Sequence, residues 1–176
     1  MFAPLDKNRS ILYDNRMKLL TIGLSLFLSV SAWAQNFDAQ KIDALSKAIA
    51  HAEGFYKHGT IPNRYHNPGD LKSRYGLPPL AGQRRIGKAG HIVFISDATG
   101  WAALQEYILK IAEGRSRHYA QDTTLTQLSR IYAQRWRPWI KQVSKTLNIS
   151  PTTRLREFLA EPENSVDYWP EICYNL

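Results

Sequence analysis

A stretch rich in glycine and proline is the feature that most limits how this 176-residue chain can fold. Residues 57–90 contain four prolines and six glycines. Both residue types interrupt helices, and proline also removes a backbone donor, so regular helix is excluded for most of the stretch. Loops of this length are uncommon in a compact domain unless they carry a function. We therefore expect a domain that holds one long functional loop.

Regular elements are predicted on both sides of this loop. Before it, apolar residues recur at three- and four-residue spacing over residues 38–56, which predicts an amphipathic helix. After it, "HIVFIS" predicts a short strand that pairs with the segment around Ile86 as a hairpin. Later helix starts are marked by capping residues at Asp97 or Thr99, at Thr124 with Gln127, at Pro138, and at Ser150 with Pro151. Gly114 is expected to end the first of these later helices. The predicted class is α+β and predominantly α-helical, with a small β-hairpin and a long Gly/Pro-rich loop.

The N-terminal part has the pattern of a secretory signal. Met17 and Lys18 precede a run without charged residues over residues 19–30, and Ala32-Trp33-Ala34 fits the signal peptidase pattern. This run is shorter than the roughly 20 apolar residues that span a bilayer. We predict that residues 1–34 are an N-terminal extension plus a signal peptide, with translation starting at Met1 or Met17, and that residues 35–176 form one domain. The expected location is periplasmic or secreted, without stable membrane insertion.

The charge of the chain indicates its class of partner, and its cysteine content limits its covalent cross-links. The chain has 23 Lys and Arg against 15 Asp and Glu, a net charge of +8. This excess suits an anionic partner such as cell wall, outer-membrane lipid or nucleic acid. Cys173 is the only cysteine, so no internal disulfide can form. Nothing in the sequence indicates a metal, a cofactor or an obligate partner, and we expect a monomer.

Glu53 is the residue that most strongly indicates chemistry. It lies four residues after Ile49 on the apolar face of the first helix, directly before Gly54. Loss of water on that face raises the pKa of a carboxyl group, and the negative end of the helix dipole raises it further. A carboxyl that stays protonated near neutral pH is the proton donor that cleavage of a glycosidic bond requires. The alternative is a glutamate that ends a surface helix and reaches into water.

Polar residues around a Pro-Gly turn follow in "RYHNPGDLK". His66, Asn67 and Asp70 surround this turn. Asn67 and Asp70 could fix the backbone of the turn or hydrogen-bond to a ligand. Several aromatic residues could stack on sugar rings, although most are expected in the core: Tyr56, Tyr65, Tyr107, Tyr132 and Trp136. Trp101 is also expected to pack in the core.

Four segments together resemble a lysozyme-like group of bacterial and phage muralytic proteins. The segments are "AIAHAEGFY", "HNPGDLK", "GHIVFISDATGWAALQEYI" and "TLTQLSRIYAQRW", within residues 41–159. The pattern of that group is a helix ending in Glu-Gly, then Asn-Asn-Pro-Gly-Asn-Leu, a Phe strand, and a Gly-Trp-Ala-Ala-Leu helix. The resemblance implies a lysozyme-like fold with Glu53 as the catalytic acid. His66 and Asp70 depart from it, since each replaces an asparagine of the turn.

The resulting expectation is a secreted glycosidase that cleaves peptidoglycan between N-acetylmuramic acid and N-acetylglucosamine. Glu53 would act as general acid and base, with the substrate-binding residues His66, Asn67, Asp70, Tyr65 and Tyr132. A muramidase would need a second carboxyl group, for which Asp70 and Asp97 are candidates. A lytic transglycosylase would need only the glutamate, because a hydroxyl of the sugar replaces water.

Two other classes stay open. A wall-binding module could keep the same fold without turnover, because function depends on the site and not on the fold. A secreted nuclease could use His66, Asn67 and His91, although their spacing fits no metal-binding template and we expect no nucleic-acid partner. Loss of activity with a chelator would favour the nuclease.

Overall fold

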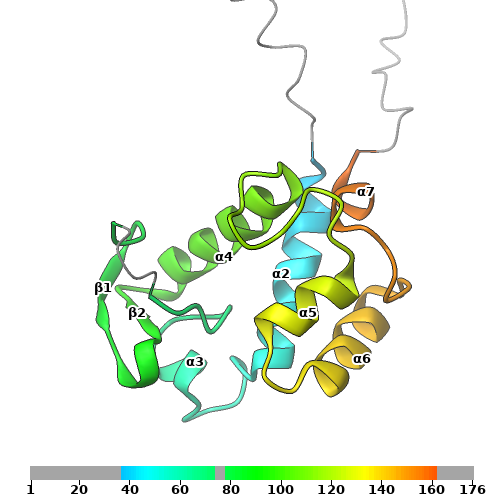
Figure 1. Cartoon of the computed structure of the whole chain (residues 1–176). Helices are drawn as coiled ribbons and strands as arrows, with labels where there is room; N and C mark the ends of the chain where they lie inside the picture. The colour runs from blue at the N-terminus through cyan, green and yellow to red at the C-terminus, as the bar shows by residue number, and fades with distance from the viewer. Residues whose placement is uncertain (1–36, 74–77, 162–176) are drawn as a thin grey trace, which may run out of the picture. The chain divides into compact units, whose positions relative to one another are not determined.

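The computed structural model describes residues 37–73 and 78–161, which belong to a compact unit beginning at Phe37 (Figure 1). About half of these residues are helical, and the fold is mixed α+β with a small two-stranded antiparallel sheet. The predicted signal segment and Cys173 lie outside the described residues. Within the described ranges, no helix has the length and apolar character needed to cross a membrane.

Helix α2 (Ala39–Glu53) confirms the first predicted helix. It begins after Asp38, whose side chain accepts hydrogen bonds from the backbone N–H groups of Gln40 and Lys41. It ends at Gly54, which adopts the left-handed conformation with φ of 77°, as glycine at this position commonly does. Glu53 is therefore the last residue of the helix, as its place before a glycine suggested.

The small sheet is the predicted hairpin. Strand β1 (Gln83–Ile86) pairs antiparallel with β2 (Ile92–Phe94), and the 3-10 turn η2 (Lys88–Gly90) lies between them. A short helix, α3 (Ile61–Arg64), is the only α-helical turn described within residues 57–90. An isolated bridge between Lys72 and His91 joins the long loop to the sheet.

Two helix starts differ from the prediction. Helix α4 (Asp97–Ala112) is capped by Ser96, and neither Asp97 nor Thr99 is the cap. Thr99 instead completes a capping box, because its side chain accepts from the backbone of Ser96 while Ser96 accepts from that of Thr99. Helix α7 (Leu155–Leu159) begins well after Ser150, which forms a turn by accepting from the Thr153 N–H.

The other helix starts are confirmed. Helix α5 (Leu125–Tyr132) has the capping box of Thr124 and Gln127, and α6 (Trp136–Leu147) has Pro138 in its first turn. Gly114 follows the end of α4 in a left-handed conformation with φ of 71°.

Helix α2 is the centre of the helical core, since it packs against α4, α6 and α7 (Figure 1). The main core cluster includes Leu45 and Ile49 of α2 and Val143 of α6, and Trp101 packs against its edge as expected. A second, smaller cluster joins the hairpin to α4 through Ile92, Phe94 and Ala103 with Leu71 of the loop. Tyr107 and Tyr132 pack against both clusters.

Close backbone contact locks the polar turn onto the start of α4. A Cβ atom at Gly100 would lie 1.9 Å from the carbonyl oxygen of His66, so no larger residue fits there without movement. The Gly-Trp pair at the start of this helix is therefore explained by packing. The contact holds residues 66–70 between the hairpin and the helices.

Candidate active site

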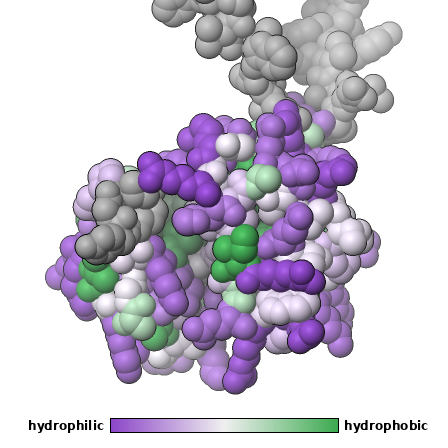
Figure 2. All heavy atoms as spheres, in the orientation of Figure 1, coloured by the Kyte–Doolittle hydropathy of each residue, from purple (hydrophilic) through white to green (hydrophobic). Residues whose placement is uncertain are grey.

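A cleft of about 1600 Å³ lies between the helices and the loop with the hairpin. Ala52, Glu53 and Trp139 line it from the helical side, and Asp70 and His91 line it from the other side. Figure 2 shows a hollow on this face, bordered mainly by hydrophilic side chains. Glu53 is thus on the wall of a large cleft and not at the open surface.

Glu53 has the properties of a proton donor. Burial raises the pKa of its carboxyl group from 4.5 to about 7. The indole N–H of Trp139 donates a hydrogen bond of 2.7 Å to Glu53 Oε1 and limits this rise, while the charge of Asp70 adds to it and that of Lys72 opposes it. Near neutral pH a substantial fraction of Glu53 therefore keeps its proton while facing the cleft.

Asp70 and His91 form a close pair on the opposite wall of the cleft. Asp70 Oδ1 lies 2.7 Å from His91 Nδ1, and neither atom has another partner among the described residues. Burial raises the pKa of the Asp70 carboxyl group, and His91 and Lys72 reduce that rise. Asp70 has a positive φ of 47°, a conformation that asparagine and aspartate tolerate better than most residues. The polar turn therefore does add a carboxyl group to the cleft.

Tyr132 joins the polar loop to helix α5 at the wall of the cleft. Its hydroxyl donates to the carbonyl oxygen of Gly69. A Cβ atom at Gly69 would lie 2.9 Å from that hydroxyl and 2.8 Å from Leu104, so the Pro-Gly turn needs glycine for this close approach. Burial and the nearby charge of Glu53 raise the pKa of Tyr132 well above 10, which keeps the phenol a donor.

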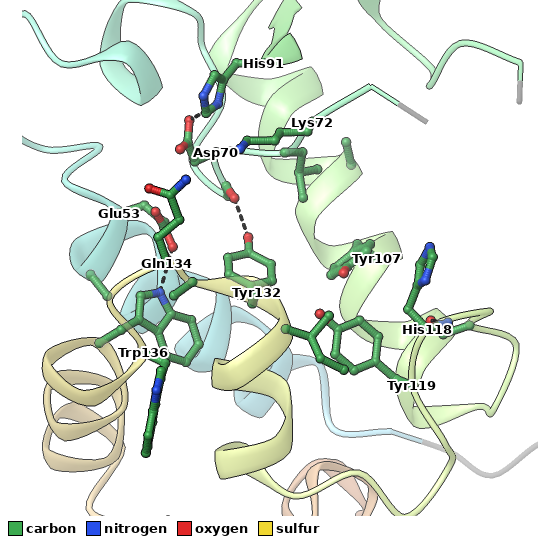
Figure 3. A pocket seen from close by; sticks show the side chains of 18 of the residues that line it. Glu53, Asp70, Lys72, His91, Tyr107, His118, Tyr119, Tyr132, Gln134 and Trp136 are labelled. Carbon is green, nitrogen blue, oxygen red and sulfur yellow. Dashed lines mark hydrogen bonds and ion pairs between the residues drawn. The ribbon is translucent and has the colours of Figure 1, made fainter. Parts of the chain in front are cut away.

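A row of aromatic rings leads from the candidate acid along the cleft. Trp139 contacts Tyr132 with ring centroids 5.5 Å apart, Tyr132 contacts Tyr107 at 6.0 Å, and Tyr107 contacts Tyr119 at 6.2 Å. All four line the cleft. In Figure 3, Tyr132 and Tyr107 lie between Glu53 and the end that contains Tyr119. The row extends the site well beyond the position of the acid.

Three of the predicted substrate-binding residues lie outside the cleft lining. Asn67 is fully buried, where its side chain donates to the carbonyl groups of Leu71 and Ile92 and accepts from the Leu71 N–H. It therefore holds the turn, which is the structural role considered for it. His66 points outward and pairs with Asp97, Nδ1 to Oδ1, at 2.7 Å, so Asp97 is no partner for Glu53.

Tyr65 is also placed away from the cleft. Its ring packs on Gly87, where a Cβ atom would lie 2.4 Å from the ring, and its hydroxyl accepts a hydrogen bond from the Lys88 N–H. The prediction of Tyr65 as a sugar-binding residue is therefore not matched by its position. The residues that the structure brings together are Glu53, Asp70 and Tyr132.

Trp139 and Lys72 were not recognised from the sequence as parts of the site. Trp139 is 86 positions after Glu53 and lies on the apolar side of α6, where it reads as a core residue. Lys72 is visible as the end of "HNPGDLK", and its position two residues after Asp70 was the available signal. His91 was considered only as a nuclease ligand.

Comparison with protein-family models, curated proteins and solved structures gives no match for this chain. Within residues 37–73 and 78–161, no group of three or more His, Cys, Asp and Glu side chains is placed to hold a metal ion. His66 and His91 in particular are paired with different aspartates on different sides of the loop. The function must therefore be inferred from the residues of the cleft.

Proposed function

We propose that this chain is a lysozyme-like glycosidase that cleaves the glycan strands of peptidoglycan, with Glu53 as general acid and then base. The observation that carries the proposal is a carboxyl group on the wall of a large cleft with its pKa raised to about 7. Proton transfer to a leaving sugar oxygen needs such a group near neutral pH. The helices that line one side of the cleft, and the polar loop with His91 that lines the other, support the arrangement that the sequence resemblance implies.

In the proposed reaction, protonated Glu53 gives its proton to the glycosidic oxygen as the bond from that oxygen to C1 breaks. The resulting Glu53 carboxylate then takes a proton from the incoming nucleophile, either water or a hydroxyl of the same sugar. The first nucleophile makes a reducing end and the second makes an anhydro end. Asp70 is held by His91 at 2.7 Å, and this pairing favours the second outcome, because a paired carboxylate is a weaker nucleophile.

The direct test is digestion of purified sacculi, followed by mass spectrometry of the released fragments. We expect fragments lighter by one water than hydrolytic products. Glu53→Gln keeps the size of the side chain and its acceptor for Trp139 but cannot supply a proton, so it should reduce cleavage by about 10²-fold to 10⁴-fold. Glu157→Gln is a matched control, because Glu157 is exposed on α7 and outside the cleft lining.

The same experiment separates the main alternatives. Reducing ends would indicate a muramidase with the same acid. A protein that binds sacculi and never cleaves them would be a glycan-binding module, for which the aromatic row and the basic cleft residues would suffice. Full cleavage by Glu53→Gln would contradict the role proposed for Glu53.

A further inference from the structure

The cleft has a basic end that the proposed cleavage step does not use. The aromatic row leads from Trp139 beside Glu53 to Tyr119, which follows the segment of residues 115–118. Figure 3 shows His118 and Glu53 at opposite sides of the pocket, with Tyr132 and Tyr107 between them. In that view, the two rings separate the His118 end of the cleft from the carboxyl group that would protonate the bond.

Basic residues outnumber acidic ones along the whole cleft. Among the described residues that line it, six are Lys or Arg and three are Asp or Glu: Lys72, Lys110, Arg115, Arg117, Arg130 and Arg135 against Glu53, Asp70 and Glu106. Protonation of Glu53 reduces the negative charge further near neutral pH. The cleft is therefore positive overall and attracts anionic ligands.

Arg117 is the cation at the basic end that is least compensated. Lys110 pairs with Glu106, and Arg115 pairs with Glu113. Arg117 is exposed and makes no ion pair with any residue in the described ranges. Arg130, also in the cleft lining, stacks on the ring of Trp136 at 5.0 Å and likewise makes no ion pair in those ranges. A guanidinium group on a cleft wall without a carboxylate of its own suits a carboxylate of a ligand.

We propose that this basic end, defined by Lys110, Arg115, Arg117 and His118, binds the free carboxylates of the peptides that branch from peptidoglycan strands. The inference rests on the proposed function, since it names a further part of the same substrate. A strand with its reactive bond at Glu53 extends along the aromatic row, and its acidic peptide branches then reach the basic end. The protein would thus prefer peptide-bearing strands whose carboxylates are free.

Binding measurements in a Glu53→Gln background test this without turnover. Affinity is measured for peptide-bearing glycan strands and for the same strands with their carboxylates converted to amides. We expect the free carboxylates to bind about three- to tenfold more tightly, because exposed charge contacts are individually weak. Adding Arg117→Glu should remove most of this difference. Arg117→Lys should keep most of it.

Lys141→Glu is the matched control. Lys141 is exposed on α6 and outside the cleft lining, so its reversal changes net charge equally without touching the basic end. Equal affinity for the two strand types would overturn the inference. An equal effect of Arg117→Glu and Lys141→Glu would also overturn it, because the net positive charge of the protein would then explain the binding. A wrong proposal for the function would give a different result. The wild type would leave sacculi uncut while the preference for free carboxylates persisted.

Discussion

The two sides of the polar loop each carry an aspartate–histidine pair, in very different surroundings. On the cleft side, Asp70 and His91 are 2.7 Å apart with side chains 23% and 10% exposed. On the outer side, Asp97 and His66 are also 2.7 Å apart, but their side chains are 60% and 46% exposed. The residue types and the distance are the same. The difference in burial therefore decides which pair can influence chemistry, because only buried charges interact strongly through a medium of low polarity.

Glu53 is also largely buried, and its pKa depends on the kind of partner that it has. Its 2.7 Å contact is to the indole N–H of Trp139, which is a neutral donor. A neutral donor stabilises the ionised form less than a cation would, so burial dominates and the pKa of Glu53 stays at about 7. Glu53 thus has a neutral partner, whereas Asp70 has a histidine as its partner. That contrast fits the proton-donor role proposed for Glu53.

The largest expected effect comes from removing the charge of Glu53. Its folded pKa of about 7 exceeds its ordinary value of 4.5. The neutral form is favoured by the fold, so this contribution to stability is full below pH 4.5 and is lost as the pH rises through 7. A difference of this size corresponds to about 3 kcal/mol. At pH 8, the free energy of unfolding of Glu53→Gln, measured in urea, should therefore exceed that of the wild type by up to about 3 kcal/mol.

At pH 4 the same variant should differ little from the wild type, since Glu53 is then protonated in both the folded and unfolded states. Glu157→Gln serves as the control, because Glu157 is exposed and should show no such dependence on pH. A stability difference for Glu53→Gln that is the same at pH 4 and pH 8 would mean that Glu53 is not a buried acid in solution.

The next effect compares the two aspartates directly. Asparagine tolerates the positive φ of position 70, so Asp70→Asn removes the charge without backbone strain. It deprives a buried histidine of its carboxylate partner, and we expect the free energy of unfolding measured in urea to fall by about 2 kcal/mol. Asp97→Asn breaks an exposed pair at the first turn of α4 and should cost no more than about 1 kcal/mol. Equal losses would remove the distinction between the two sides of the loop.

Most of the helices, and the place of Glu53 at the end of the first one, could be predicted because local sequence signals determine them. A capping box at Thr124 and a glycine after Glu53 act within a few residues of the helix ends that they define. The start of α4 was misplaced because Ser96, Asp97 and Thr99 can each cap a helix. In the structure, the mutual hydrogen bonds of Ser96 and Thr99 make Ser96 the cap.

The candidate site was harder to predict because neighbouring residues in the loop point in different directions. His66 and Asp70 both have positive φ, and the buried Asn67 lies between them in the sequence. His66 is directed outward and Asp70 into the cleft, although both belong to one motif. No periodicity applies to such a turn. The role of Trp139 could not be predicted for a similar reason, because its contact with Glu53 joins helices that are far apart in the sequence.

The smallest expected effect tests how the indole N–H of Trp139 influences the pKa of Glu53. Trp139→Phe keeps an aromatic ring in the core but removes the N–H that bonds to Glu53. Because that bond favours the ionised carboxylate, its loss should raise the pKa of Glu53 further. The decline of sacculus cleavage with rising pH should then move to higher pH, with a stability loss of about 1 kcal/mol. Trp101→Phe, outside the cleft lining, should leave the pH profile in place. A profile that does not move in Trp139→Phe would show that the titrating group is not Glu53.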